Sequence, residues 1–120
     1  TGDIGYIGKD NFLYVVDRKK DMIISGGENI YSPEVESAVM THEDVREVAV
    51  IGLPDERWGE SVCAVVVPRE GATIDEAAII AHSRSRIAAY KCPKRVVVMD
   101  ELPHVPTGKV DKVALRKLYR

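Results

Sequence analysis

Apolar residues occur along this chain in short runs separated by polar, glycine-containing or proline-containing segments. Short apolar runs bounded by turn residues are typical of β-strands. The pattern predicts strands at Met22–Ile24, Val45–Ile51, Val62–Val67 and Val96–Met99. The run Val62–Val67 is apolar at every position and stops at Pro68, which predicts the central strand of a sheet.

A hairpin is predicted near the start of the chain, where Ile4–Gly8 and Phe12–Val16 flank the polar turn Lys9–Asn11. The polar run Asp17–Asp21 follows it. Because this polar run separates the hairpin from everything after it, we interpret it as a linker.

The first helix is predicted at Ser32-Pro33, with Ser32 as the N-cap and Pro33 at the first helical position. Glu34 and Glu36 then lie near the positive end of the helix dipole. The spacing of the next apolar residues predicts one buried face, formed by Val35, Ala38 and Val39.

Two further helices are expected. Thr73–Glu76 has the spacing of a capping box, and the helix after it is predicted to run to about Ala89. Asp111 is predicted to cap a last helix, whose apolar face consists of Leu115, Leu118 and Tyr119. Strands and helices mix without a strict βαβ repeat, so the predicted class is α+β: a small mixed sheet with packed helices, preceded by a β-hairpin.

Composition narrows the class of protein. The chain has 120 residues, which fits one domain, and is 45% hydrophobic and 30% charged. A net charge of −2 gives no overall attraction for nucleic acid, and no apolar stretch is long enough to span a bilayer. Cys63 and Cys92 suggest neither a disulfide framework nor a metal site, so we expect a reducing, cytoplasmic location. Because the chain begins at Thr1 without Met, we expect a fragment of a longer protein.

Three familiar motifs are excluded by their spacing. The glycines within residues 2–8 form G-x-x-G-x-x-G, not the dinucleotide-binding G-x-G-x-x-G, and no strand precedes them. Gly108-Lys109 is not a P-loop, because Pro103 and Val110 stand where that motif needs Gly and Ser or Thr. The three histidines have no ligand-like spacing, so no metal site is predicted.

Two segments allow both a structural and a functional interpretation. Gly26-Gly27 suits a sharp turn, or a backbone that approaches another surface closely. Pro106–Lys109 is a proline-stiffened loop whose ammonium is a strong point charge for phosphate or carboxylate oxygens, or simply an exposed lysine before a helix. Residue chemistry alone favours the structural interpretation of each segment.

The order of several motifs resembles the acyl-adenylate-forming superfamily, which comprises acyl-CoA synthetases, adenylation domains of peptide synthetases and beetle luciferases. The motifs are Thr1-Gly2-Asp3, Asp17–Asp21, Gly26–Asn29, Pro33–Glu36, Trp58-Gly59-Glu60, Tyr90–Lys94 and Pro106–Lys109. They extend over essentially the whole chain, and their order and spacing together are highly specific. The resemblance implies that residues 18–120 are a mobile C-terminal domain and residues 1–17 the hairpin at the end of a large N-terminal domain.

The superfamily activates a carboxylate with ATP, which gives an acyl-adenylate and pyrophosphate, and its synthetases then transfer the acyl group to CoA. The resemblance therefore implies an AMP-forming acid–thiol ligase that uses ATP with Mg²⁺ and CoA. The implied partners are the large N-terminal domain, a carboxylic acid and CoA. Because the acyl pocket lies in the large domain, we expect the fragment alone to be inactive, and its residues do not identify the acid.

Residue by residue, the resemblance implies that Asp3 binds the ribose hydroxyls of ATP and Arg18 contacts the nucleotide. Lys20 occupies the hinge position. Lys109 is the implied catalytic residue, which stabilises negative charge on the attacking carboxylate and the α-phosphate during adenylation. Pro103–Lys109 also fits the Pro-x-x-x-x-Gly-Lys pattern that accompanies acetylation in bacterial synthetases. A lysine acetyltransferase acting on Lys109 is therefore a further expected partner.

A second implied site binds CoA. Gly26 and Gly27 are expected to line the pantetheine tunnel, Trp58 to stack on adenine and Lys94 to meet a phosphate. Tyr90 belongs to the same implied surface, whereas Cys92 stands where some relatives carry a basic residue. The alternative for Trp58 is packing beneath its own loop.

Two other functions stay open on the sequence alone. One is an adenylation module that loads a carrier protein in place of CoA. The other is a non-catalytic relic of the fold that binds nucleotide or CoA. The presence of Asp3, Arg18 and Lys109 favours an enzyme over the relic.

Overall fold

The computed structural model describes residues 22–119. The hairpin predicted at Ile4–Gly8 and Phe12–Val16, and the domain boundary predicted after residue 17, lie outside the described residues. The same is true of the implied site residues Asp3, Arg18 and Lys20.

The described chain begins with an antiparallel hairpin of β1 (Met22–Ser25) and β2 (Glu28–Tyr31). Its turn consists of Gly26 and Gly27, whose φ angles are 60° and 83°. Two-residue hairpin turns in which both φ angles are positive favour Gly-Gly, because a side chain is strained there. The first strand is confirmed. The second was not predicted, because its residues are mostly polar and exposed, with only Ile30 buried.

Helix α2 (Ser32–Met40) follows β2 directly and buries the predicted face of Val35, Ala38 and Val39. The prediction that Ser32 is the N-cap is wrong. The helix already includes Ser32, and its N-cap is Tyr31, which makes no side-chain capping bond. The buried Ser32 hydroxyl instead accepts a hydrogen bond from Lys112 Nζ at 3.0 Å, which joins the start of α2 to the start of the last helix.

A mixed three-stranded sheet forms the centre of the domain. Its strands are β3 (Val45–Asp55), β4 (Gly59–Pro68) and β5 (Arg95–Val98), in the order β3-β4-β5. β3 and β4 are antiparallel, with Val50 opposite Ala64, and β5 runs parallel to β4. The α+β class with a small mixed sheet is confirmed, as is the central position of the Val62–Val67 strand.

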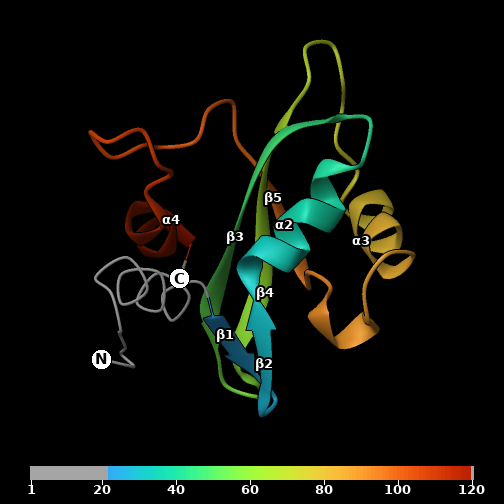
Figure 1. The fold of residues 1–120 in the computed structure, drawn as a ribbon, viewed down its shortest axis with the longest axis vertical. Helices are drawn as coiled ribbons and strands as arrows, with labels where there is room; N and C mark the ends of the chain where they lie inside the picture. The colour runs from blue at the N-terminus through green and yellow to red at the C-terminus, as the bar shows by residue number, and fades with distance from the viewer. Residues whose placement is uncertain (1–21, 120) are drawn as a thin grey trace, which may run out of the picture.

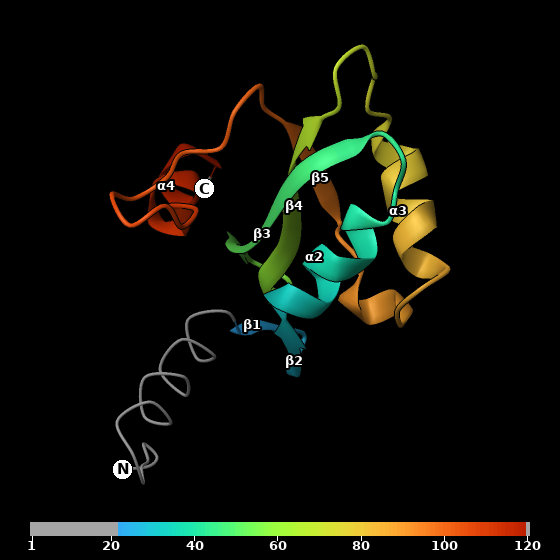
Figure 2. The same ribbon diagram turned by 45° about the horizontal axis from the view of Figure 1, so that its top comes forward.

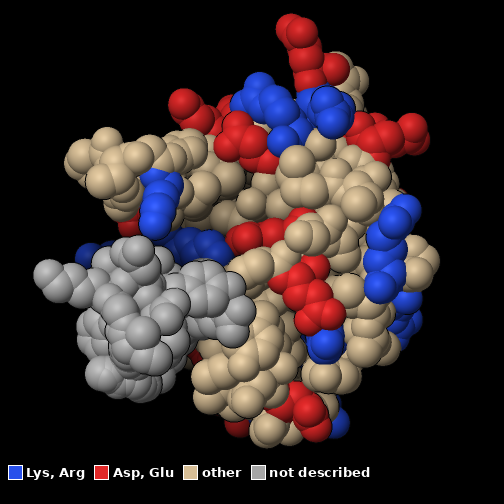
Figure 3. Space-filling view, viewed as in Figure 1, with Lys and Arg blue, Asp and Glu red and all other residues tan. Residues whose placement is uncertain are grey.

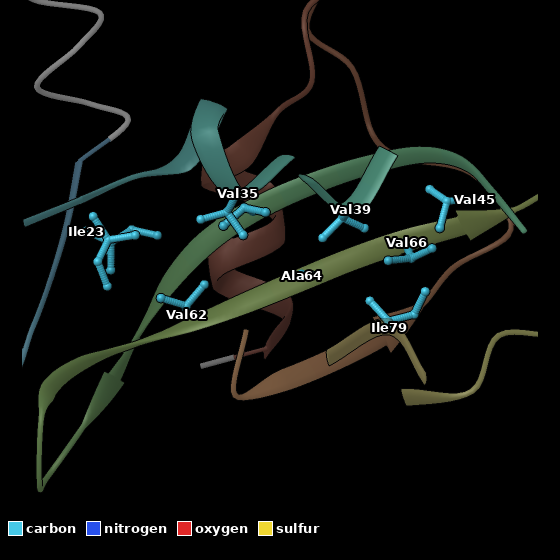
Figure 4. Packing of buried hydrophobic residues seen from close by; sticks show 10 residues of the cluster. Ile23, Val35, Val39, Val45, Val62, Ala64, Val66 and Ile79 are labelled. Atoms are coloured by element: carbon cyan, nitrogen blue, oxygen red, sulfur yellow. The ribbon is translucent and has the colours of Figure 1, made fainter. Parts of the chain in front are cut away.

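Helices cover both faces of this sheet. α2 and α3 (Glu76–Arg84) lie on one face, and α4 (Lys112–Tyr119) lies on the other (Figures 1 and 2). Val62, Ala64 and Val66 of β4 pack with residues of α2 and α3, including Val35, Val39 and Ile79 (Figure 4). Cys63, Val65 and Val67 point to the other face, where they pack with Leu102 and Leu115. Burial of β4 on both faces explains why its sequence is continuously apolar.

The helix expected after Thr73 is shorter than predicted. α3 spans Glu76–Arg84 instead of reaching Ala89, and its N-cap is Asp75, whose carboxylate accepts from the Ala77 N–H at 3.3 Å. The predicted capping box does not form, because the Glu76 carboxylate accepts from the Val96 N–H of β5 at 2.8 Å. A short 3-10 helix, η1 (Ala89–Lys91), then returns the chain to the sheet for β5.

The last helix is capped as predicted, since Asp111 Oδ1 accepts from the Ala114 N–H at 3.0 Å. Its predicted apolar face is only partly correct. Leu115 is fully buried and Tyr119 packs on the same cluster, but Leu118 is 62% exposed. α4 contacts the sheet along a narrow strip, and Leu118 lies outside that strip. None of the helices within residues 22–119 has the length and apolar character needed to cross a membrane.

Both cysteines are free and buried, so we expect low thiol reactivity in the folded state. Burial raises the pKa of the Cys63 thiol to about 11, and burial also raises the pKa of Cys92. Because the thiolate is the reactive form, both thiols should react slowly with a disulfide reagent at pH 8 and rapidly after unfolding in guanidinium. Fast stoichiometric labelling of Cys63 in the native protein would contradict its placement in the core.

Candidate functional site

Lys109 lies in a tight turn between β5 and α4 (Figure 1). The Gly108 N–H donates to the Val105 carbonyl at 2.8 Å, and the Val105 N–H donates to the Lys109 carbonyl at 2.9 Å. Pro106 occupies the turn position at which its fixed φ is favoured, and Gly108 has a φ of 96°. The backbone of Lys109 is therefore fixed by hydrogen bonds as well as by proline.

The Lys109 side chain itself is exposed and makes no hydrogen bond or ion pair with any of residues 22–119. A lysine ammonium is a compact charge with three donors, which suits phosphate and carboxylate oxygens. The turn thus presents a positive charge on an ordered backbone, which is the arrangement expected of a residue that meets an anionic ligand from outside this domain.

Three contacts hold the Lys109 turn to the rest of the domain. The Asp111 N–H donates to the Pro103 carbonyl at 2.8 Å, which closes the base of the turn. Leu115 inserts into the core beneath α4. Lys112 Nζ reaches α2, where it lies 2.9 Å from Glu36 Oε2. The pairing of Lys112 with Glu36 was not predicted, and no local signal in the sequence indicates it.

A second feature combines the Gly26-Gly27 turn with Trp58, which lies in the turn between β3 and β4. The Gly26 N–H donates to the Trp58 carbonyl at 2.8 Å. A Cβ placed on Gly26 would lie 2.9 Å from Trp58 Cε3, closer than real Cβ contacts, whereas a Cβ on Gly27 would meet nothing within 4 Å. Gly26 is therefore required both for its backbone conformation and for the close approach of the Trp58 ring.

Cationic side chains surround the Trp58 ring. Lys94 Nζ lies 5.0 Å from the ring centroid and Arg57 Cζ lies 5.3 Å from it. The Trp58 backbone is fixed by Asp55, whose Oδ1 accepts from the N–H groups of Arg57 and Trp58 at 2.8 and 2.9 Å. Trp58 is still 39% exposed. A partly exposed aromatic ring with two cations close to it suits an anionic ligand that carries an aromatic group.

The contact between Gly26 and Trp58 leads to a direct test. Alanine at either glycine should cost about 1 kcal/mol of folding free energy, because both φ angles are positive. Gly26→Ala should also displace the indole ring, so its fluorescence emission should shift, whereas Gly27→Ala should leave the emission unchanged. Trp58 is the only tryptophan, so the emission reports on this site alone. Equal spectra for the two variants would contradict the contact.

Tyr90 does not join Trp58 in any contact within the described residues. It is 45% exposed, and Lys91 Nζ lies 5.7 Å from its ring centroid. Lys91 is bound to α2 through both Glu34 oxygens, at 3.0 and 3.1 Å, and this hydrogen-bonded pair raises the pKa of Lys91. The implied CoA surface therefore divides into a group around Trp58 and a separate Tyr90–Lys91 pair.

The Lys109 turn and the Gly26–Trp58 contact lie on different sides of the domain. The turn before α4 and the β1–β2 turn are well separated in both ribbon views (Figures 1 and 2). On the face shown in Figure 3, acidic and basic side chains are interspersed and do not gather into one basic patch. The Lys109 turn and the Gly26–Trp58 contact are therefore two separate features of the domain surface.

No metal site is found in this part of the molecule, because residues 22–119 contain no cluster of three or more metal-ligating side chains. His42 and His82 do meet edge to face, with ring centroids 5.0 Å apart, although they are far apart in sequence. Burial lowers the pKa of His82, with smaller contributions from His42 and Arg86. Thr41 Oγ1 lies 2.6 Å from His82 Nε2, and this Thr41–His82 contact connects the end of α2 to α3.

Comparison with known sequences identifies a protein family and several relatives of this chain. The sequence profile of the family described as "AMP-binding enzyme C-terminal domain" matches residues 34–109. A long-chain-fatty-acid–CoA ligase of Mycobacterium tuberculosis is 50% identical over 119 residues, which are 99% of this chain and 24% of that protein. The indoleacetate–CoA ligase of Aromatoleum aromaticum is 52% identical over 118 residues, 98% of this chain and 23% of that protein. The chain thus spans about a quarter of the length of these relatives.

Solved structures agree with the sequence comparison. The chain superimposes on ATP-bound MatB from Rhodopseudomonas palustris with a TM-score of 0.81 and 44% identity, covering 84% of this chain and 20% of that one. A Mycobacterium tuberculosis fatty acyl CoA synthetase gives a TM-score of 0.78 and 49% identity, covering 83% of this chain and 20% of that one.

Proposed function

Because this chain belongs to the family of AMP-binding enzyme C-terminal domains, we propose that it is the C-terminal domain of an AMP-forming acyl-CoA synthetase. The complete enzyme converts a carboxylate and ATP to an acyl-adenylate and pyrophosphate, and then transfers the acyl group to CoA with release of AMP. The observation that supports this most strongly is that the turn before α4, which contains Lys109, and the β1–β2 turn, which contains Gly26 and Gly27, lie well apart on one domain.

In the first half-reaction, Lys109 is the catalytic residue. A carboxylate oxygen attacks the α-phosphorus of ATP, and pyrophosphate leaves. Negative charge is then concentrated on the carboxylate and the α-phosphoryl oxygens. A fixed ammonium near these oxygens stabilises the transition state without having to reorganise. The hydrogen-bonded Val105–Lys109 turn and the absence of an ion pair to Lys109 within residues 22–119 support this role.

In the second half-reaction, the side of the domain that carries the Gly26-Gly27 turn and Trp58 contacts CoA. The CoA sulfur attacks the acyl carbonyl carbon, its proton is lost, and AMP leaves. Gly26 and Gly27 lie beside the pantetheine arm: the open space at Gly27 leaves room for the arm, and Gly26 allows the Trp58 ring to come close to the turn. Trp58 faces the adenine, and Lys94 faces a phosphate. The cationic groups around the Trp58 ring support this assignment. Tyr90, which lies next to Lys91 and apart from Trp58, is a further proposed contact of CoA.

Using both sides requires the domain to turn relative to a large N-terminal domain. We place the hinge at Lys20, with Asp3 and Arg18 on the nucleotide, residues 1–17 at the end of the large domain and residues 18–120 in the mobile one. ATP is used with Mg²⁺, for which residues 22–119 offer no evident ligand cluster. A cytoplasmic location and acetylation of Lys109 stay predictions, and the exposure of Lys109 suits a modifying enzyme.

The proposal is tested by product analysis with the full-length protein. ATP, Mg²⁺ and CoA are supplied with fatty and aryl carboxylates, because the relatives act on both kinds of acid according to their names. We expect acyl-CoA, AMP and pyrophosphate in equal amounts, and no turnover by the 120-residue chain alone. ADP as the product, or acylation of a carrier protein without acylation of CoA, would contradict the proposal.

A further inference from the structure

Glu60 connects the central sheet to the β1–β2 hairpin. It is the second residue of β4, and its Oε1 accepts from the Ile24 N–H of β1 at 2.9 Å. Glu60 reaches β1 across Gly52 of β3, where a Cβ would lie 2.9 Å from Glu60 Oε2 and 3.1 Å from Ile23 Cγ2. Glycine at position 52 thus provides the space in which the Glu60 carboxylate lies.

This connection determines where the Gly26-Gly27 turn lies. β1 and β2 form a sheet of their own, which shares no strand pairing with β3, β4 and β5. Hydrogen bonds nevertheless join the β1–β2 hairpin to the start of β4 and the turn before it: Ile24 of β1 donates to Glu60, and Gly26 donates to Trp58. Because Glu60 and Trp58 flank Gly59, the Glu60 bond fixes the register in which Gly26 meets Trp58.

A second glutamate, Glu36, makes a comparable connection to the helix that follows the Lys109 turn. Glu36 Oε2 accepts from the Val50 N–H of β3 at 2.9 Å and lies 2.9 Å from Lys112 Nζ. Lys112 is the first residue of α4 and also donates to Ser32 Oγ at 3.0 Å. The side chains of Glu36 and Lys112 are 25% and 19% exposed, so the pair is partly shielded from water. It joins the helix that follows the Lys109 turn to both α2 and β3.

We propose that Glu60 and Glu36 are positioning residues for separate half-reactions: Glu60 orients the Gly26–Trp58 surface for thioester formation, and Glu36 orients the Lys109 turn for adenylation. This inference rests on the proposed function, and it assigns roles to residues that contact no substrate. Neither carboxylate has to touch a ligand, because Glu60 acts through the Ile24 N–H of β1 and Glu36 acts through the Lys112 ammonium and the Val50 N–H of β3.

Loss of the Glu60 or the Glu36 carboxylate is expected to slow one half-reaction. Removing either carboxylate leaves a strand N–H without its acceptor, and the segment it holds can then shift. Displacement of a catalytic segment by about 1 Å can lower a rate by about 10²-fold. Glu→Gln retains an acceptor oxygen, so it should restore most of the activity that Glu→Ala loses at position 60. At position 36 the rescue should be weaker, because glutamine does not pair with the Lys112 ammonium.

The test measures both half-reactions in the full-length enzyme for Glu60→Ala, Glu60→Gln, Glu36→Ala and Glu36→Gln. Adenylation is followed by ATP–pyrophosphate exchange, and thioester formation by transfer from a synthetic acyl-adenylate to CoA. We expect Glu60→Ala to lower transfer by about 10-fold to 100-fold with exchange preserved. We expect Glu36→Ala to lower exchange by a similar factor with transfer preserved. General destabilisation would lower both rates in both variants, so the crossed pattern distinguishes positioning from folding.

Gly52→Ala provides an independent variant if Glu60→Ala fails to fold, because it displaces the Glu60 carboxylate without removing it. It should lower transfer and spare exchange. Parallel losses in both half-reactions, or normal transfer in Glu60→Ala and Gly52→Ala, would overturn the positioning roles while the wild-type enzyme still forms acyl-CoA. A wild type that shows neither exchange nor transfer would instead overturn the proposed function itself.

Discussion

Replacing Lys109 with alanine in the full-length protein is expected to slow carboxylate-dependent ATP–pyrophosphate exchange by about 10²-fold or more. The ammonium is exposed on a turn that backbone hydrogen bonds hold in place, so its loss removes a charge without disturbing a buried contact. The folding free energy should therefore stay close to that of the wild type, because surface substitutions of this kind usually change it by less than about 0.5 kcal/mol.

Lys117 provides a matched control, since it is an exposed lysine on α4 and lies eight residues further along the chain. Lys117→Ala removes the same charge from the same side-chain type, away from the turn. Exchange should be normal in this variant. An equal loss in both lysine variants would indicate that overall charge, and not the position of Lys109, accounts for the effect.

Leu115→Ala is expected to have the largest effect on stability, about 2–5 kcal/mol of unfolding free energy. Leu115 is completely buried against the sheet, and it is the only fully buried residue of α4 in the described part of the chain. Its truncation leaves a cavity between α4 and the sheet, in the cluster that also contains Ile51, Val65 and Leu102. Guanidinium unfolding of the 120-residue domain measures the change directly.

Leu118→Ala makes the same chemical change on the same helix, but Leu118 is 62% exposed. Its unfolding free energy should differ from wild type by less than about 0.5 kcal/mol. Similar losses for Leu115→Ala and Leu118→Ala would mean that both leucines are buried, as their spacing first predicted, and that the rotation of α4 differs from the one described.

The parts of the fold that could be predicted are those where local pattern and burial agree. The Val62–Val67 run is apolar because both faces of β4 are covered, so its central position followed from the sequence. β2 was missed because a short strand with a polar exposed face has no distinctive pattern. The error at Leu118 has a similar cause, since helical spacing identifies an apolar stripe but not how wide the contact beneath it is.

The residues of the candidate site also divide into those that the sequence could predict and those that it could not. Lys109, Gly26 and Trp58 were identified by the order of motifs along the chain. The residues that hold them were not, because those contacts join positions far apart in sequence. Glu60 binds β1 36 residues earlier, and Lys112 binds Ser32 80 residues earlier. Chain spacing carries no signal for such pairs. The collision that a side chain on Gly26 would have with Trp58 likewise becomes visible only once the two turns are in contact.

The central claim is that the domain uses two separate surfaces for the two half-reactions. It is tested most directly by the rate at which the Lys109→Ala enzyme transfers the acyl group of a preformed acyl-adenylate to CoA. Because the Lys109 turn and the Gly26–Trp58 surface lie on different sides of the domain, we expect this rate to equal that of the wild type even though exchange is lost. A transfer rate that falls by the same factor as exchange would show that Lys109 acts in both half-reactions, and it would contradict the division of function between the two surfaces.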